Sequence, residues 1–424
     1  MKKWNRPSIG MFIQIISCFS VMVVFGQNDV YLKVQSSNYN PIPLVILPFD
    51  SPPRNDWILK MRDVLVSDLD FTGLIKILPM PTPTVPINAF AFIETRCSSK
   101  NDEVEIKTTL RDADTREVIF EKTFITSSDN FQKHAHEWSD AILFHLTGEQ
   151  GIAQTKIAYT VKGKRVETIM VSDYDGWNIH QASRDDSLNL SPCWSPDGSK
   201  ICYTTNSSGR SGFSIFDMVK RQSTLIPCAR GMYSTPVWSP DGKKIAFTWS
   251  IGGNAEIYCM DETGNAIQRL TNNAAIDCSP SWSPDGREFA FTSDRSGSPQ
   301  IFMMDSYGGN VRRLTYSGSY NDSPAWSPIG DLIAFVSRGQ TGFQIMTIDV
   351  NGENLRQLTD DPYSHEDPSW APNGMHFLFA ANPNQKWDIY AMRADGSGHR
   401  QLTNSGVNIS PSWSPYLTRS GKMD

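Results

Sequence analysis

The sequence predicts an N-terminal α/β domain followed by an all-β six-bladed propeller with one-plus-three strand closure. Three observations lead to this prediction. A tryptophan-led phrase recurs six times in the second half of the chain, at spacings of 44, 44, 44, 44 and 43 residues. The first repeat unit lacks this phrase, whereas the last phrase lacks the strand that should follow it. The chain before the repeats instead mixes helical and strand patterns.

The N-terminus has the pattern of a secretory signal peptide. Basic residues up to Arg6 precede a nearly uncharged run from Ile9 to Phe25, so we expect residues 1–26 to be removed on export. Two alternatives are an uncleaved membrane anchor and a lipoprotein site at Cys18. The second is disfavoured because the residues after Cys18 stay apolar instead of opening into a polar tether.

Residues 38–150 have the pattern of a small α/β domain, because apolar residues recur there at both helical and strand spacing. The last helix should be capped by Ser128 or Asp129 and should end at Gly148. We expect, in order, a strand at 44–49, a helix at 56–70, a strand at 74–78, a hairpin of 104–110 and 117–125, and a helix over 131–146.

The repeat region, residues 155–417, has the period of a propeller blade. Each unit contains four short β segments. A Pro-Asp-Gly turn follows the inner strand, because proline presets the backbone angle there and glycine accepts positive φ. The segment Ile157–Tyr159 has no inner strand before it, so Ile409–Trp413 should supply that strand and close the ring. Residues 418–424 are left as a short tail.

Composition excludes several functional classes. The 424 residues carry 39 Lys and Arg against 45 Asp and Glu, a net charge of -6, which argues against a nucleic-acid-binding surface. A single long apolar stretch excludes a multi-span membrane protein. The cysteines after the signal peptide have no Cys-x-x-Cys spacing, so we expect buried free thiols and no metal site, and their pairing stays open. They are Cys97, Cys193, Cys202, Cys228, Cys259 and Cys278.

The sequence contains no recognisable catalytic motif. There is no Gly-x-Ser-x-Gly elbow, and no Gly-rich loop leads from a strand into a helix, so neither a serine hydrolase nor a nucleotide-binding protein is indicated. A propeller lyase would need metal ligands converging at the channel mouth. The positions five residues before each tryptophan include one histidine and one carboxylate, which is no ligand set. We therefore predict a non-catalytic protein without metal or cofactor.

The same six positions mark a candidate protein-binding site. In a four-stranded blade, the connection into the inner strand and the loop after the second strand lie on one face of the ring. Polar loops there have the composition of a recognition surface, and a concave channel mouth favours binding. The alternative is ordinary solvent-facing turns. The predicted partner-binding residues of the channel mouth are Asn189, Tyr233, Asp277, Asn321, His365 and Asn408.

The region before the repeats resembles a known family more specifically than the repeats do. The segments Ile42–Phe49 (IPLVILPF), Ser67–Leu74 (SDLDFTGL) and Ala135–Ile142 (AHEWSDAI) resemble the N-terminal domain of the TolB family, the periplasmic component of the Tol-Pal envelope system. The closing phrase at Trp413 (WSPYL) is also similar to the end of that family. Residues 80–103 depart from the family pattern.

The resemblance implies a non-catalytic periplasmic protein that supports outer-membrane integrity and envelope constriction during cell division. TolB-like proteins bind the peptidoglycan-associated lipoprotein Pal through the propeller and TolA through the N-terminal region. Residues 27–37 match the family's mobile N-terminal segment. There, Val30, Leu32 and Val34 alternate with polar residues, so we expect them to add as an edge strand to this protein or to a partner.

The resemblance further implies a monomer that is peripheral to membranes and binds no nucleic acid. Two alternatives stay open at this point. One is a periplasmic lyase-type propeller enzyme, which bound metal in the purified protein would reveal. The other is a scaffold of another envelope complex, which only the identity of the partner distinguishes from the TolB role.

Overall fold

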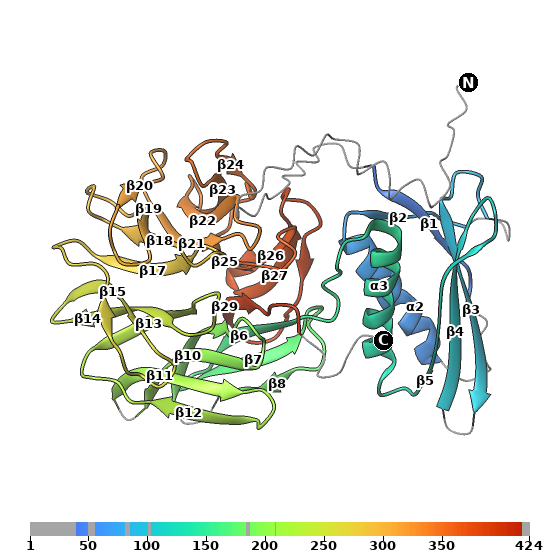
Figure 1. The fold of residues 1–424 in the computed structure, drawn as a ribbon, viewed down its shortest axis with the longest axis horizontal. Helices are drawn as coiled ribbons and strands as arrows, with labels where there is room; N and C mark the ends of the chain where they lie inside the picture. The colour runs from blue at the N-terminus through green and yellow to red at the C-terminus, as the bar shows by residue number, and fades with distance from the viewer. Residues whose placement is uncertain are drawn as a thin grey trace, which may run out of the picture. The chain divides into compact units, whose positions relative to one another are not determined.

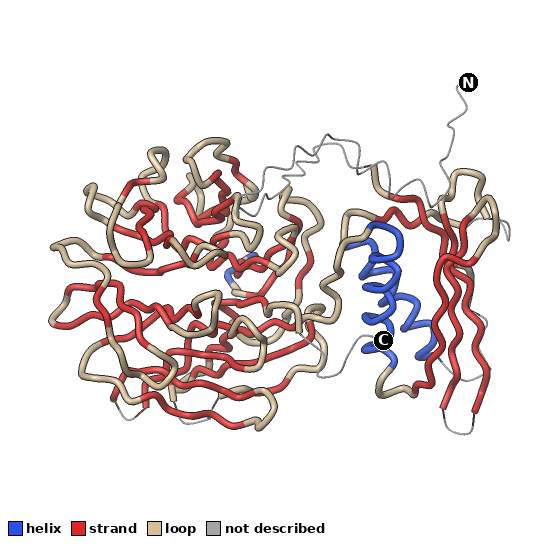
Figure 2. Tube along the Cα trace, in the orientation of Figure 1, coloured by secondary structure: helices blue, strands red, loops and turns tan. Residues whose placement is uncertain are grey.

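The structure is a computed structural model that describes residues 40–49, 56–80, 85–100, 103–183, 187–207 and 209–417. The predicted signal peptide, the segment 27–37 and the tail 418–424 lie outside the described residues. The described residues from Pro41 onward belong to one compact unit. Figure 1 labels the elements, and Figure 2 shows that the α-helices of the described residues belong to the region before the repeats, whereas the repeat region is built almost entirely of strands and loops.

The N-terminal region contains one sheet, made of β1 (Ile42–Ile46), β2 (Ile75–Ile77), β3 (Ala91–Lys100), β4 (Glu103–Asp112) and β5 (Val118–Thr126). The strand order is β2-β1-β3-β4-β5. β1 pairs in parallel with β2 and β3, whereas β3, β4 and β5 form an antiparallel meander. The pairing of β4 with β5 confirms the hairpin predicted for 104–110 and 117–125.

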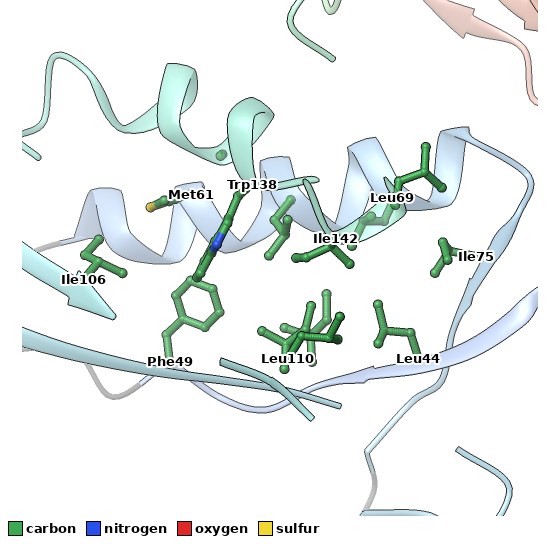
Figure 3. Close-up of a cluster of buried hydrophobic side chains, with 14 of the residues drawn as sticks. Leu44, Phe49, Met61, Leu69, Ile75, Ile106, Leu110, Trp138 and Ile142 are labelled. Atoms are coloured by element: carbon green, nitrogen blue, oxygen red, sulfur yellow. The ribbon is translucent and has the colours of Figure 1, made fainter. Parts of the chain in front are cut away.

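Two helices, α2 (Asp56–Phe71) and α3 (Phe131–Thr147), pack on the same face of this sheet. Their apolar stripes meet the inward side chains of the strands in one core (Figure 3). Trp138 of α3 is fully buried there, and its ring meets that of Phe49 edge-on with centroids 6.4 Å apart. Burial of large apolar side chains such as these contributes about 1.5–3 kcal/mol each to stability.

The ends of α3 test the predicted caps. The helix begins after Asn130, which makes no side-chain capping bond, so the prediction of a cap at Ser128 or Asp129 is wrong. The helix ends at Gly148 as predicted, where the backbone is left-handed with a φ of 77° and the Gly148 N–H donates to the Phe144 carbonyl. Glycine suits this position because it has no Cβ to clash with the preceding carbonyl.

Four sheets of the repeat region have four strands each. The first is β13 (Met232–Trp238), β14 (Ile245–Ile251), β15 (Asn254–Met260) and β16 (Gln268–Arg269), and the second is β17 (Asp277–Trp282), β18 (Glu288–Ser293), β19 (Gln300–Asp305) and β20 (Arg312–Arg313). The third is β21 (Asn321–Trp326), β22 (Leu332–Arg338), β23 (Phe343–Asp349) and β24 (Arg356–Gln357), and the fourth is β25 (His365–Trp370), β26 (His376–Ala381), β27 (Asp388–Arg393) and β28 (Arg400–Gln401). A short 3-10 helix, η1 (Pro383–Gln385), lies between β26 and β27.

The fifth sheet has eight strands: β6 (Lys156–Lys162), β7 (Glu167–Asp173), β8 (His180–Gln181), β9 (Leu188–Trp194), β10 (Lys200–Ser207), β11 (Arg210–Asp217), β12 (Gln222–Ile226) and β29 (Asn408–Trp413). Its order is β12-β11-β10-β9-β7-β6-β29, with β8 on β7. The two ends of the repeat region meet here, because β29 pairs with β6 and Trp413 lies opposite Ile157.

The predicted six-bladed propeller is wrong as stated. The described repeat region has four separate four-stranded sheets and one eight-stranded sheet. A parallel contact between Glu167 of β7 and Leu188 of β9 joins two sets of strands that the repeat predicted to be separate. The two sets are joined by this one long-range contact, between the first residue of β7 and the first residue of β9.

The C-terminal end of α2 is bound by side chains of the repeat region. The last carbonyls of a helix have no partner within the helix. Arg393 of β27 donates from Nη2 to the Asp70 carbonyl at 2.6 Å and from Nε to the Phe71 carbonyl at 3.1 Å. His376 of β26 donates from Nε2 to the same Phe71 oxygen at 2.8 Å, and burial lowers the pKa of His376 to about 4, so the ring is neutral.

A buried charge cluster holds α2, α3 and the loop after β7 together. The Asp68 carboxylate accepts hydrogen bonds from His136 Nδ1 at 2.8 Å, Ser139 Oγ at 2.8 Å and Tyr174 Oη at 2.5 Å. A carboxylate oxygen of Asp175 lies 3.3 Å from His136 Nε2. Burial opposes the charged form of His136, but the carboxylates of Asp68 and Asp175 outweigh it and raise the pKa to about 10. His136 is therefore protonated at neutral pH.

Candidate protein-binding site at the propeller mouth

The mouth of the ring is the end at which the inner strands β9, β13, β17, β21, β25 and β29 begin. Each inner strand contacts the next, and β29 contacts β9, so these strands form a closed ring. Each one contains a bulge, with a non-glycine residue at a φ between 47° and 55° three positions before its tryptophan. Such a conformation costs on the order of 1–2 kcal/mol per residue, so packing in the ring must offset it. These residues are Ser191, Thr235, Ser279, Ser323, Asp367 and Ser410.

The structure brings the six predicted mouth residues to equivalent positions, at the first or second residue of each inner strand. All of them are buried, with at most 4% of the side chain exposed. They therefore do not form an outer contact surface in this structure, and their predicted role in binding stays untested. These residues are Asn189, Tyr233, Asp277, Asn321, His365 and Asn408.

Hydrogen bonds from these buried residues hold the mouth loops. Asn408 Nδ2 donates to Asp388 Oδ1 at 2.8 Å, which ties β29 to the start of β27. Asp277 accepts from Asn273 Nδ2 at 2.6 Å and from Arg295 Nη2 at 2.7 Å, so it fixes the loops on both sides. These buried residues therefore hold the strands and loops of the mouth in place.

Asn189, Tyr233 and His365 are also held by contacts within the protein, through a hydrogen bond, a ring stack and a carboxylate respectively. Asn189 Oδ1 accepts from Thr205 Oγ1 at 2.9 Å, and Tyr233 stacks on Trp249 with ring centroids 5.2 Å apart. His365 Nε2 lies 3.3 Å from a carboxylate oxygen of Asp361, while burial lowers the pKa of His365. Contacts within the protein thus hold the side chain of His365 in place, as they do at the other mouth positions.

The exposed side chains of the mouth lie one residue earlier in the chain, and sequence reasoning missed them. Leu188, Met232 and Ile276 are exposed by 40%, 74% and 47%, and Ile251 on the neighbouring hairpin by 55%. Strand side chains alternate between two faces, so the neighbour of a buried strand residue points to solvent. That alternation was the signal that could have located them. They form an apolar sector of the rim.

The opposite part of the ring carries an acidic sector. Asp322 accepts hydrogen bonds from Thr292 Oγ1 at 2.7 Å and from Tyr320 Oη at 2.9 Å. Burial raises the pKa of Glu366 to about 7, and the neighbouring carboxylates of Asp367 and Asp322 act in the same direction. Carboxyl groups therefore cluster on the strands β21 and β25, while the apolar sector lies at the starts of β9, β13 and β17.

Other predicted features are placed as follows. Val30, Leu32 and Val34 lie outside the described residues. The six cysteines of the described region are free thiols, each buried or half-buried. Within the described residues, no cluster of three or more His, Cys, Asp and Glu side chains has the geometry to hold a metal ion. None of the helices in this part of the chain is long and apolar enough to cross a bilayer.

A compact α/β region followed by a closed ring of repeated β-sheets, with a polar and apolar rim, defines a two-part β-propeller protein. The family profile of the TolB beta propeller domain matches residues 144–417. The chain therefore belongs to the TolB β-propeller family. This confirms the resemblance inferred from the motifs before the repeats.

Curated relatives carry a more specific name. The Tol-Pal system protein TolB of Roseobacter denitrificans is 30% identical over 252 residues, which cover 53% of this chain and 57% of the relative. The protein of the same name from Cereibacter sphaeroides is 29% identical over 223 residues, covering 47% of this chain and 50% of the relative. The chain thus spans about half the length of the curated relatives it matches.

Solved structures extend the likeness to the N-terminal region. The crystal structure of TolB from Acinetobacter baumannii superposes with a TM-score of 0.77 at 27% identity, covering 89% of this chain and 97% of that protein. A putative TolB from Agrobacterium tumefaciens, at 22% identity, a TM-score of 0.51 and coverage of 61% of this chain and 91% of that protein, shows the fold alone.

Proposed function

We propose that this protein is a non-catalytic component of a Tol-Pal system that is exported to the periplasm and acts by binding other proteins. The names of the relatives support the system, and the rim of the propeller mouth supports the mode of action. Its exposed apolar side chains, above all Met232 with 74% exposure, are the observation that carries the proposal. Desolvated apolar anchors at the centre of an interface supply most of its binding free energy.

The proposed partners are a Pal-like peptidoglycan-associated lipoprotein at the propeller mouth and a TolA-like inner-membrane protein at the N-terminal region. The apolar sector of the rim fits an apolar side chain of the lipoprotein. The acidic sector around Asp322 and Glu366 fits lysine or arginine side chains of the same partner, since complementary charge orients an encounter. In this role the protein is a monomer, peripheral to membranes, and supports outer-membrane integrity and constriction during division.

The proposed organisation of the chain follows the same reasoning. Residues 1–26 direct export, 38–150 form the α/β domain and 155–417 the propeller. The segment 27–37 lies between the signal peptide and the α/β domain in the sequence. It adds through Val30, Leu32 and Val34 as an edge strand, either to this protein or to the TolA-like partner. A protein that starts at Tyr39 should therefore lose binding of the TolA-like domain and keep binding of the Pal-like domain. Unchanged TolA-like binding would remove the proposed role of this segment.

Calorimetric titration with the soluble domain of the organism's own Pal-like lipoprotein tests the propeller mouth. We expect micromolar or tighter binding, weakened at least about tenfold (about 1.4 kcal/mol) when Met232→Ser and Ile276→Ser are combined. The matched control is Tyr307→Ser, which removes a side chain with 77% exposure from the turn between β19 and β20, at the end of the sheet away from the mouth. No binding by a folded protein would exclude the Pal-like partner, and an equal loss in the control would exclude the mouth.

A further inference from the structure

A cavity of about 170 Å³ opens at the mouth end of the sheet β21–β24. Asn321 of β21 lies opposite Ser337 of β22, and Ser337 lies opposite Gln344 of β23. Directly opposed residues share one face of a sheet, so these three polar side chains stand side by side. All three line the cavity, together with the apolar side chains of Phe335 and Met346 and with Arg338, which is exposed at its edge.

Two buried oxygen atoms of this cavity lack partners. Asn321 Oδ1 and Gln344 Oε1 accept no hydrogen bond from any described residue, although the two side chains are only 1% and 3% exposed. The amide groups cannot rotate to satisfy them. Asn321 Nδ2 donates to Gln300 Oε1 and the Ser317 carbonyl, both at 2.8 Å, and Gln344 Nε2 donates to two carbonyls of the next loop. A buried acceptor without a hydrogen bond is destabilising, so the cavity favours a ligand that donates hydrogen bonds.

The neighbouring sheet β17–β20 shows which group fits this place. With the repeat of 44 residues, Asp277, Ser293 and Phe291 correspond to Asn321, Ser337 and Phe335. There, Arg295 fills the space. Its Nη2 donates to Asp277 Oδ2 at 2.7 Å, its Nε donates to Ser293 Oγ at 2.9 Å, and its guanidinium carbon lies 5.4 Å from the centre of the Phe291 ring.

The residue that corresponds to Arg295 in the sheet β21–β24 is Gly339, which also lines the cavity. Glycine supplies no side chain, so the acceptors and the aromatic ring remain while the counterpart of the Arg295 guanidinium is missing; the exposed Arg338 is the one cation that lines the cavity. We propose that this cavity, the guanidinium pocket, binds the guanidinium group of an arginine side chain that a partner protein inserts at the propeller mouth.

The chemistry of the pocket distinguishes arginine from lysine. A guanidinium is planar, presents five N–H donors in a fixed fork and stacks on aromatic rings. It can therefore meet Asn321 Oδ1, Ser337 Oγ and Gln344 Oε1 while it lies over Phe335. An ammonium group is compact and strongly hydrated, so it satisfies fewer of these groups. Because the pocket has Asn321 where the neighbouring sheet has Asp277, binding lacks the ion pair and should be reversible.

Ethylguanidinium is the first probe, with ethylammonium as its matched control. A ligand that binds only the folded state raises the melting temperature. We expect millimolar ethylguanidinium to raise the melting temperature of the protein, while the same concentration of ethylammonium has a much smaller effect. Gly339→Arg, which places the protein's own guanidinium in the pocket, should abolish the response, and Asn321→Asp should strengthen binding severalfold.

Two further variants separate the pocket from its surroundings. A Cβ at residue 339 would lie 3.1 Å from Gln344 Cγ and from the Gly342 carbonyl oxygen, so Gly339→Ala controls for this contact and should keep the response. Arg295→Gly should open a second pocket in the sheet β17–β20 and raise the number of bound ethylguanidinium ions per protein from one to two, if the variant melts cooperatively. If the Arg295→Gly variant does not fold, the comparison of Gly339→Arg with Gly339→Ala tests the pocket.

Equal responses of the wild type and Gly339→Arg would refute the pocket, as would equal responses to the two probes. Titration with acetyl-Gly-Arg-Gly-amide, its lysine counterpart and free arginine then identifies the source of the group. Binding of the arginine peptide supports a partner's side chain, whereas binding of free arginine alone would overturn that source. These tests contain no lipoprotein, so their outcome is independent of the proposed Pal-like partner.

Discussion

The charge cluster around Asp68 predicts a large and pH-dependent loss of stability for Asp68→Asn. In the native protein Asp68 is 5% exposed and accepts three hydrogen bonds, one of them from the protonated ring of His136. The variant leaves that buried cation with Asp175 as its remaining carboxylate partner. Breaking one side of a buried ion pair costs about 3–5 kcal/mol, and we expect a loss of this size near neutral pH.

The pH dependence follows from the pKa of His136, which is raised from 6.5 to about 10. A raised folded-state pKa contributes stability that is complete below the unfolded-state value and is lost as the pH rises through the folded-state value. This difference corresponds to an upper limit of about 5 kcal/mol, at about 1.4 kcal/mol per pH unit. The difference in unfolding free energy between wild type and Asp68→Asn should therefore be largest near pH 6 and should shrink toward pH 10.

Urea unfolding of both proteins at about pH 6, pH 8 and pH 10 measures this difference. Ser139→Ala is the control, because it removes one hydrogen bond to Asp68 and leaves the charge pair in place. It should cost about 1–3 kcal/mol, with little dependence on pH. A difference for Asp68→Asn that stays constant between pH 6 and pH 10 would refute the assignment of a charged His136 stabilised by Asp68.

Three further predictions concern other parts of the fold. Arg393→Ala should expose the carbonyls of Asp70 and Phe71, cost about 1–3 kcal/mol and speed amide hydrogen exchange at the end of α2, while slower exchange would contradict it. Glu366→Gln should stabilise the protein at about pH 8 and have no effect below its unfolded-state pKa of 4.5, because burial raises its folded-state pKa to about 7; urea midpoints at both pH values decide. A chain that ends before Asn408 lacks β29 and should melt without a cooperative transition, so an unchanged melting curve would rule out a closing role for that strand.

The repeat predicted the strands of the propeller because the signal is local. Each tryptophan phrase, its turn and the following apolar segment specify a strand, a reversal and a second strand from neighbouring residues alone. The count of sheets failed for a nonlocal reason. The contact between Glu167 of β7 and Leu188 of β9 joins strands of two successive repeat units, and no pattern within one repeat records it.

The structure places the predicted mouth residues at equivalent positions of the inner strands but buries their side chains, and their role in binding stays a prediction. The positions five before each tryptophan are polar, which suggested exposure, yet their partners lie on other loops and on the neighbouring sheets. Asp277 is polar because it binds Arg295 and Asn273 inside the ring. The exposed Met232 is apolar and was overlooked for that reason.

The sequence by itself determined the family, the α/β region with its hairpin and its Gly148 helix end, and the strands of the repeat, because dihedral preferences and apolar periodicity act over a few residues. Only the tertiary structure decided which mouth residues are buried, that Arg393 and His376 bind the end of α2, and that Gly339 leaves a cavity where Arg295 fills one. Those outcomes depend on packing between residues that are tens to hundreds of positions apart, and burial, hydrogen bonding and charge there are properties of the assembled chain.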